Sequence, residues 1–212
     1  MTGFTGIYLH GFLSSAMSAK GQWFKHKVEQ SSADQNGLTA SSARLTELLT
    51  PSYQISSPQL SAKQLDEVIA EVLQSTQNVI LIGSSMGAFY ARYFAHKYRL
   101  PYIMINPAFN VVQLFNQHLG RYQNPVTKEF VEINDCYINA LSEFEINEMD
   151  CGLPSLLLVD KDDEVIDVDY ALQIYQNELF TRHQTIVYSG GDHSFIHLPE
   201  AWSAMQNFIK KL

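Results

Sequence analysis

Residues 79–87 read Val79-Ile80-Leu81-Ile82-Gly83-Ser84-Ser85-Met86-Gly87, and this stretch decides the fold. The four apolar residues at its start are typical of a strand that is buried on both faces of a sheet. The next five match the pattern G-x-S-x-G, and residues 88–98 have a helix-like composition. Glycines at both ends of the pattern permit a tight strand-to-helix turn because they have no Cβ to obstruct it. The stretch therefore predicts a nucleophile elbow that exposes Ser85.

Short apolar runs elsewhere in the chain predict five more strands, the last of them weak. They lie at residues 7–9, 102–105, 156–159, 185–188 and 53–55. Between them the apolar spacing changes to the helical period. Strands and helices that alternate in this way predict an α/β fold with a mostly parallel central sheet of about six strands flanked by helices.

Three helices can be placed from their start signals. Ser61 and Gln64 form a capping box before the amphipathic run at 65–73. Asp167 is expected to open a second helix, and Pro199 is expected to open a C-terminal one. These helices separate the expected strands, as a parallel sheet requires.

The chain has 212 residues, a length that suits a single domain over 1–212. Residues 107–152 lack a clear strand but carry several aromatic side chains. We expect this stretch to form a small, mostly helical cap inserted into the domain.

Charge and composition exclude several classes of protein. The 14 Lys and Arg residues are scattered and stand against 22 Asp and Glu, which gives a net charge of −8. No nucleic-acid or membrane partner is therefore expected. No apolar run approaches the roughly 20 residues of a membrane helix, and the first residues lack the features of a secretory signal. The two cysteines have neither disulfide-framework nor metal-finger spacing, so we expect a cytoplasmic protein with reduced thiols.

A serine hydroxyl needs a base to take its proton and an acid to orient that base. Behind a nucleophile elbow these partners follow in the order acid, then histidine. His193 follows the last expected strand within the glycine-rich segment 190–195, at the end of the sheet where α/β catalytic residues gather. His193 is therefore the expected base, and His197 is the second choice.

The acid is expected in the loop after the strand at 156–159. That loop contains Asp160, Asp162, Asp163, Glu164 and Asp167. Their alternation resembles a calcium-binding EF-hand loop, but Val165 stands where that loop needs Gly and Ala171 where it needs Glu. Calcium binding through this motif is excluded, and the spacing leaves the choice between Asp162 and Asp163 open.

Two backbone amides are expected to stabilise the oxyanion of a tetrahedral intermediate. Met86, directly after the serine, supplies the first. Phe12 supplies the second, because His10-Gly11-Phe12 follows the strand at 7–9. For His10 itself a structural role beside this loop is expected rather than proton transfer.

Six motifs occur together along almost the whole chain. They are Tyr8-Leu9-His10-Gly11-Phe12, Pro58-Gln59-Leu60, Gly83-Ser84-Ser85-Met86-Gly87, Asn106-Pro107-Ala108, Asp163-Glu164-Val165 and Gly190-Gly191-Asp192-His193-Ser194-Phe195. The combination resembles the serine α/β-hydrolases, and more closely the small bacterial YqiA/YcfP-like esterases. The resemblance implies an α/β-hydrolase fold in which Ser85 is the nucleophile, His193 the base and Asp163 the acid.

The sequence departs from this family in three places. Asp162 stands where similar members often have Gly, and its carboxylate is placed to compete for the histidine. Ala88 replaces a second Gly that is frequent after the elbow, a change that a helix tolerates. The segment 21–40 is longer than in the family pattern. Because it follows the loop that contains Phe12, this difference affects the expected substrate entrance and not the triad.

The sequence therefore predicts a serine hydrolase that cleaves carboxylic esters through an acyl-enzyme intermediate, with short acyl chains preferred. Its partner is a small-molecule ester, and the chemistry needs neither a metal nor an organic cofactor. Two alternatives stay open: an acyl thioesterase that uses the same triad, and a non-catalytic binding module that keeps the hydrolase fold.

Overall fold

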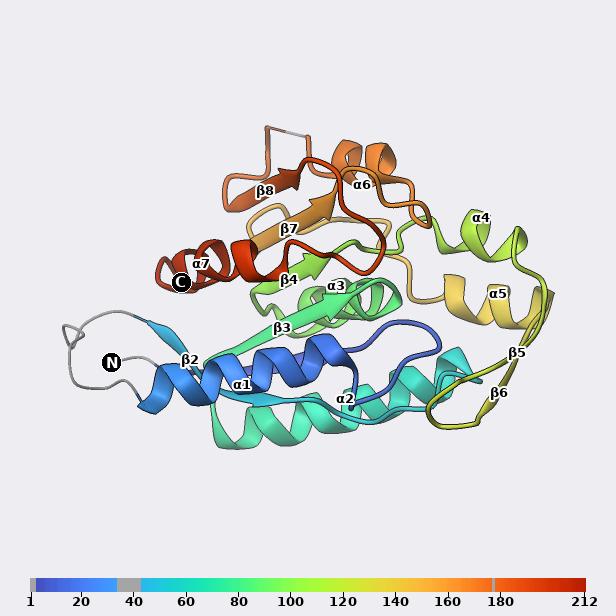
Figure 1. Ribbon diagram of the computed structural model, residues 1–212, viewed down its shortest axis with the longest axis horizontal. Coiled ribbons are helices and arrows are strands. Elements are labelled where there is room, and N and C mark those ends of the chain that lie inside the picture. Colours follow the sequence, from blue (N-terminus) through green and yellow to red (C-terminus); the bar gives the residue numbers. More distant parts are fainter. Residues whose placement is uncertain (1–2, 34–42, 177) are drawn as a thin grey trace.

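The computed structural model describes residues 3–33, 43–176 and 178–212. At its centre lies a six-stranded sheet in the order β2-β1-β3-β4-β7-β8, and all pairings between these strands are parallel (Figure 1). The strands are β1 (Gly3–Leu9), β2 (Arg44–Leu49), β3 (Val79–Ser84), β4 (Tyr102–Ile105), β7 (Ser155–Asp160) and β8 (His183–Tyr188). The expected parallel α/β sheet is confirmed.

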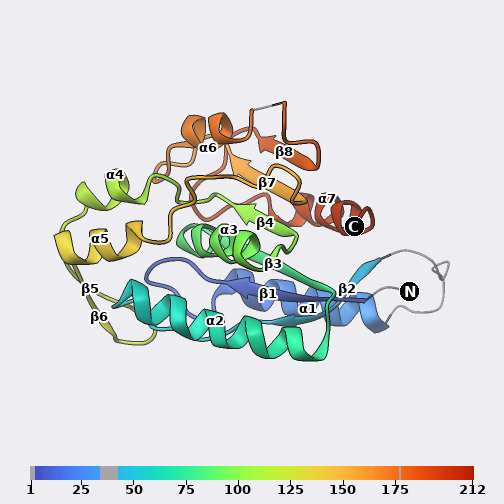
Figure 2. The ribbon, with the colours of Figure 1, turned by 180° about the vertical axis from the view of Figure 1, so that it is seen from behind.

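Helices cover both faces of this sheet. α1 (Ala19–Ala33) and α7 (Leu198–Ile209) lie on one face, and α2 (Pro58–Ser75), α3 (Met86–Tyr98) and α6 (Val168–Ile174) lie on the other (Figures 1 and 2). A hydrophobic core lies on each face of the sheet, and the side chains of β3 alternate between them. Ile80 and Ile82 lie in the core beneath α1 and α7, and Val79 and Leu81 lie in the core beneath α2, α3 and α6. Burial on both faces explains why this strand is apolar throughout.

Five of the six expected strands are confirmed, and one is wrong. The runs at 7–9, 79–82, 102–105, 156–159 and 185–188 lie within β1, β3, β4, β7 and β8. Residues 53–55 form a loop, although Tyr53 and Ile55 are buried in it. The sixth strand is β2, at the edge of the sheet, where only Leu45 and Leu48 are buried. An edge strand of this kind carries no continuous apolar run.

The helix starts differ from expectation at one helix. α2 begins with Ser57 as its N-cap and Pro58 in its first turn, so it starts before the expected capping box. Ser61 lies inside the helix, and its hydroxyl donates to the Ser57 carbonyl (3.0 Å). Asp167 caps α6 as expected, and Pro199 lies in the first turn of α7.

The segment 107–152 contains a β-hairpin that the sequence did not predict. Its elements are α4 (Val111–Asn116), β5 (Gly120–Gln123), β6 (Phe130–Ile133) and α5 (Asp135–Ser142), with β5 and β6 antiparallel. The expectation of a mostly helical stretch without strands is therefore wrong. Both strands are only four residues long; β5 has no buried residue, and β6 alternates exposed and buried residues, so an apolar run does not mark them.

Most of the segment 21–40 belongs to α1, the helix that connects β1 to β2 and packs against β2. The part of this prediction that concerns residues 34–40 lies outside the described residues. In the described ranges, no helix has both the length and the apolar character needed to span a lipid bilayer.

Candidate active site

Ser85 occupies the sharp turn between β3 and α3. Its backbone has φ 57° and ψ −124°, a conformation that a residue with a side chain adopts only under strain. Two hydrogen bonds hold it there: the Ser85 amide donates to the Ile105 carbonyl (3.0 Å), and the Ala108 amide donates to the Ser85 carbonyl (3.1 Å). The strained turn is thus fixed from the neighbouring strand β4 and the loop after it.

The two glycines of the G-x-S-x-G pattern are required by close backbone contacts. A Cβ at Gly83 would lie 2.3 Å from the carbonyl oxygen of Gly87, on the far side of the turn. A Cβ at Gly87 would lie 2.1 Å from the carbonyl oxygen of Leu9, in β1. The turn and the first residues of α3 therefore approach their neighbours as closely as only glycine allows.

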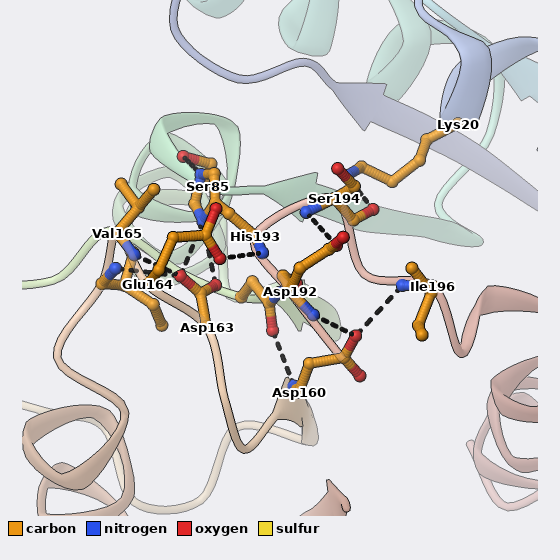
Figure 3. A network of polar contacts seen from close by, with 12 residues as sticks. Lys20, Ser85, Asp160, Asp163, Glu164, Val165, Asp192, His193, Ser194 and Ile196 are labelled. Atoms are coloured by element: carbon orange, nitrogen blue, oxygen red, sulfur yellow. Dashed lines mark hydrogen bonds and ion pairs between the residues drawn. The ribbon is translucent and has the colours of Figure 1, made fainter. Parts of the chain in front are cut away.

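Ser85, His193 and Asp163 form a continuous hydrogen-bonded chain (Figure 3). The distance from His193 Nε2 to Ser85 Oγ is 3.0 Å, and that from His193 Nδ1 to Asp163 Oδ2 is 2.9 Å. These residues come from three separate loops that follow β3, β7 and β8. The structure thus brings together Ser85 and His193, which motif order selected, and Asp163, which the family resemblance implied.

Asp163 is held in place independently of the histidine. Its side chain has no exposed surface, and its Oδ1 accepts hydrogen bonds from the amides of Val165 (2.8 Å) and Ile166 (3.0 Å). Burial by itself would raise the pKa of the Asp163 carboxyl, but the hydrogen bonds from His193 and from these two amides outweigh it and hold the pKa below its usual value. The carboxylate is therefore ionised and oriented at neutral pH.

The other candidates for the acid and the base lie elsewhere. Asp162 is exposed, and its amide donates to the Gly190 carbonyl (3.2 Å). His197 does not meet Ser85 but pairs with a different carboxylate, with 2.7 Å from its Nδ1 to Asp160 Oδ1. The choice that spacing left open is thus decided in favour of Asp163 as the partner of His193.

Asp160 fixes the loop that carries His193, a role that the sequence did not reveal. Its buried carboxylate accepts hydrogen bonds from the amides of Asp192 (3.3 Å) and Ile196 (3.0 Å), which flank the histidine (Figure 3). The Asn106 side chain braces the same loop: it accepts from the Asp160 amide (2.9 Å) and donates to the Asp192 carbonyl (2.9 Å). Asn106 was visible only as part of the Asn-Pro-Ala motif, without an assigned role.

The loop that contains Phe12 passes close to Ser85. A Cβ at Gly11 would lie 3.2 Å from the Ser85 Cβ, so the chain runs directly beside the serine at this point. In the described parts of the chain, neither the Phe12 amide nor the Met86 amide has a hydrogen-bond acceptor. Met86 is also the first residue of α3, where the helix dipole favours negative charge. Both amides therefore keep an unused N–H donor within the described residues.

His10 contacts the backbone of the loop that contains Phe12. It is buried, its ring stacks on Tyr53 with 4.1 Å between ring centroids, and its Nδ1 lies 3.0 Å from the Gly11 carbonyl oxygen. The Tyr53 hydroxyl donates to the His10 carbonyl. Burial lowers the pKa of His10, although its contact with Gly11 and the charge of Glu129 act in the opposite direction. A neutral, stacked ring agrees with a structural role.

An apolar cavity of about 250 Å³ opens beside Ser85. Its walls come from the Phe12 loop, the start of α3, α4 and the β5–β6 hairpin, and include Leu13, Met86, Ala108, Leu114, Phe115, Tyr122 and Ile133. Asn124, directly after β5, is buried, and its side chain donates to the Ser14 carbonyl (2.8 Å), which joins the hairpin to the loop after β1. The segment 107–152 therefore forms one wall of this cavity.

A comparison with known protein families identifies the family of this chain. Residues 5–210 match the uncharacterised protein family UPF0227. The chain belongs to this family. Because the match covers almost the full length, the elbow, the Phe12 loop and the His193 loop of this UPF0227 member all lie inside the shared region.

Solved structures similar to this UPF0227 member are α/β-hydrolases. Alpha/beta hydrolase domain-containing protein 10 from mouse is 16% identical over 98% of this chain and 90% of its own, with a TM-score of 0.71. Est1E from Butyrivibrio proteoclasticus is 12% identical over 99% and 88%, with a TM-score of 0.69. A structure of LipS and LipT, two metagenome-derived lipolytic enzymes, is 14% identical over 100% and 95%, with a TM-score of 0.72. At these identities the likeness establishes the α/β-hydrolase fold.

Proposed function

We propose that this UPF0227 member is a serine hydrolase that cleaves carboxylic esters. The observation that carries the proposal is the chain from Ser85 Oγ to His193 Nε2 (3.0 Å) and from His193 Nδ1 to Asp163 (2.9 Å). A hydroxyl on a strained turn, a histidine within reach of it and a buried carboxylate behind that histidine are the parts that acyl transfer to serine needs.

The reaction follows from these positions. Ser85 Oγ bonds to the ester carbonyl carbon while His193 Nε2 takes the hydroxyl proton, and Asp163 stabilises the charged imidazole. The amides of Phe12 and Met86 stabilise the oxyanion. The carbon–oxygen bond to the alcohol then breaks, and His193 returns the proton to the departing oxygen.

Water completes the cycle. His193 takes a proton from water, the hydroxide adds to the acyl carbon, and Ser85 leaves with that proton. One ester and one water thus give one carboxylic acid and one alcohol, and no step draws on a metal or an organic cofactor.

The apolar cavity indicates the acyl group. At about 250 Å³, with walls of aliphatic and aromatic side chains, it suits a short acyl chain. We assign segment 107–152 as a cap insertion within a single domain over 1–212, since α4 and the hairpin supply walls of this cavity. The proposed substrate is a small-molecule ester, and the proposed location of the enzyme is the cytoplasm.

The decisive experiment compares wild type with Ser85→Ala on p-nitrophenyl acetate, butyrate and octanoate, in parallel with the corresponding acyl-CoA substrates. We expect wild type to prefer the shorter esters and the variant to lose turnover by a factor of about 10³ or more. Faster acyl-CoA turnover would favour the thioesterase. Absence of turnover and of fluorophosphonate labelling would favour a binding module.

A further inference from the structure

A second cavity meets the acyl cavity at the candidate nucleophile. Its volume is about 440 Å³, and the two cavities share Phe12, Ser85, Val165 and His193 in their walls. The remaining walls differ in chemistry: apart from Gly11 and Ala19, those of the second cavity carry a hydroxyl or charged side chain, at Tyr8, Ser14, Ser18, Lys20, Ser84, Glu164 and Ser194. An apolar cavity and a cavity with more polar side chains in its walls therefore adjoin at the same serine.

This division sorts the two halves of an ester. When the carbonyl oxygen points to the free amides of Phe12 and Met86, the acyl chain and the alcohol extend in different directions from the carbon. The acyl chain belongs in the apolar cavity because its burial there is favourable. The alcohol then lies in the second cavity, beside His193, which must protonate it.

Lys20 provides a fixed donor in this second cavity. It lies in the first turn of α1 and is partly buried, and its Nζ donates to the carbonyl of Ser194, the residue after His193 (2.7 Å, Figure 3). An ammonium group has three N–H donors. Within the described residues this is the single hydrogen bond that Nζ makes, so two donors remain for a ligand.

Glu164 provides an acceptor of opposite charge in the same cavity. Its Oε2 accepts a hydrogen bond from the His193 amide (3.1 Å), which holds the carboxylate beside the candidate base (Figure 3). A carboxylate has about four acceptor sites, so this one keeps several for a ligand. The cavity therefore presents a positive donor and a negative acceptor together.

We infer that the second cavity binds the alcohol half of the substrate and takes a neutral polyhydroxylated alcohol, such as glycerol or a sugar. A hydroxyl group both donates and accepts, so neighbouring hydroxyls satisfy Lys20 and Glu164 together. An apolar alcohol would displace water from the remaining hydrogen-bonding positions of both charged groups and offer no hydrogen bond in exchange, which is unfavourable. An anionic alcohol is attracted by Lys20 but repelled by Glu164. This inference rests on the proposed esterase function and names its substrate class.

The first test uses esters that differ in the alcohol alone. Propyl butyrate and 1-butyrylglycerol share the acyl chain and a three-carbon alcohol, and they differ by two hydroxyl groups. We expect kcat/KM of wild type to be higher for 1-butyrylglycerol by about tenfold or more, the effect of one hydrogen bond to a charged group. We expect 1-butyrylglycerol 3-phosphate, which adds negative charge, to react no faster than 1-butyrylglycerol.

The second test asks whether Lys20 causes the preference. Lys20→Met keeps an unbranched side chain one atom shorter and removes the charge, and we expect the ratio of the two kcat/KM values to fall about tenfold. Lys25→Met is the matched control on the same helix, because Lys25 lines a different hollow with Glu47 and Thr50. A ratio is independent of how much of each variant is folded, since both substrates see the same active fraction.

The outcomes separate this inference from the proposed function. Hydrolysis of both esters that depends on Ser85 but shows equal kcat/KM values would overturn the inference and leave the esterase standing. Equal changes of the ratio in Lys20→Met and Lys25→Met would also overturn it. Absence of hydrolysis of either ester by wild type would instead overturn the esterase, and the inference with it.

Discussion

Asp162 and Asp163 are neighbours in the chain but lie in opposite environments. Asp163 points inward, where His193 and two backbone amides surround its carboxylate, while Asp162 is exposed to solvent. The carboxylate that departs from the family pattern at Asp162 therefore does not compete for the histidine. One position along the loop separates a buried, hydrogen-bonded acid from a solvated one.

Replacing each of these acids by asparagine isolates the difference. We expect Asp163→Asn to lower kcat by about 10³ to 10⁴, because an amide that faces Nδ1 favours the wrong tautomer of His193. We expect Asp162→Asn to change kcat by no more than roughly threefold, because solvent screens an exposed charge. Rates on p-nitrophenyl butyrate measure both. A similar loss in the two variants would contradict the assignment of Asp163.

Among the structural elements, the loop that carries His193 needs two adjacent glycines for its backbone conformation. Both have positive φ, 76° at Gly190 and 83° at Gly191, a conformation that favours glycine. A Cβ at Gly190 would meet nothing within 4 Å, whereas a Cβ at Gly191 would lie 2.1 Å from Asp160 Oδ2. Both positions need a backbone with positive φ, and only Gly191 also lacks room for a Cβ.

Alanine at each glycine separates backbone strain from steric contact. We expect Gly190→Ala to lower the free energy of unfolding by about 1–2 kcal/mol, the cost of the left-handed conformation. Gly191→Ala should cost more and should also lower kcat by about tenfold or more, because a displaced Asp160 releases the His193 loop. Urea unfolding and ester hydrolysis measure these effects. If the two variants behave alike, the contact with Asp160 has no role in holding the loop.

Elements made by local signals were predictable from sequence. β3, the elbow and the start of α3 follow from nine consecutive residues, because an apolar strand and two glycines act over short range. The strand β2 and the β5–β6 hairpin were missed because exposed residues interrupt their buried positions and leave no continuous apolar run.

The contacts that hold the candidate base were also outside the reach of sequence. Asn106 meets the amide of Asp160, 54 positions away along the chain, and the carbonyl of Asp192, 86 positions away. No local pattern encodes such distances, so motif order identified Ser85 and His193 but not the residues that position them. Only the parallel arrangement of β4, β7 and β8 brings these loops to one end of the sheet.

At the scale of the whole molecule, buried and partly buried histidines couple stability to pH. Burial lowers the pKa of His10, His96 and His183, and it lowers that of His183 to about 4. The His183 ring stacks on Tyr175 with 4.1 Å between centroids, and its Nδ1 lies 2.7 Å from Ser155 Oγ. These contacts lie at the start of β8, at the opposite end of this strand from the His193 loop.

The direction of the effect follows from the lowered pKa of each histidine. Between pH 6.5 and about 4 the unfolded chain has taken up a proton at each of these histidines, while the folded chain has not done so at His183. The unfolded state therefore binds more protons in this window, and the free energy of unfolding falls as the pH falls through it. Above pH 6.5 the three histidines are neutral in both states and contribute no slope.

Comparing wild type with His183→Gln isolates one of these histidines from the other groups that titrate. We expect the difference in unfolding free energy between the two proteins to shift by about 1–2 kcal/mol in favour of the variant between pH 7 and pH 4.5, since glutamine does not titrate. Urea unfolding at pH 7.0, 5.5 and 4.5 measures it. At pH 7 we expect the variant to be less stable because it loses contacts with Ser155 and Tyr175. A difference that stays constant with pH would mean that His183 takes up its proton equally in the folded and unfolded chains.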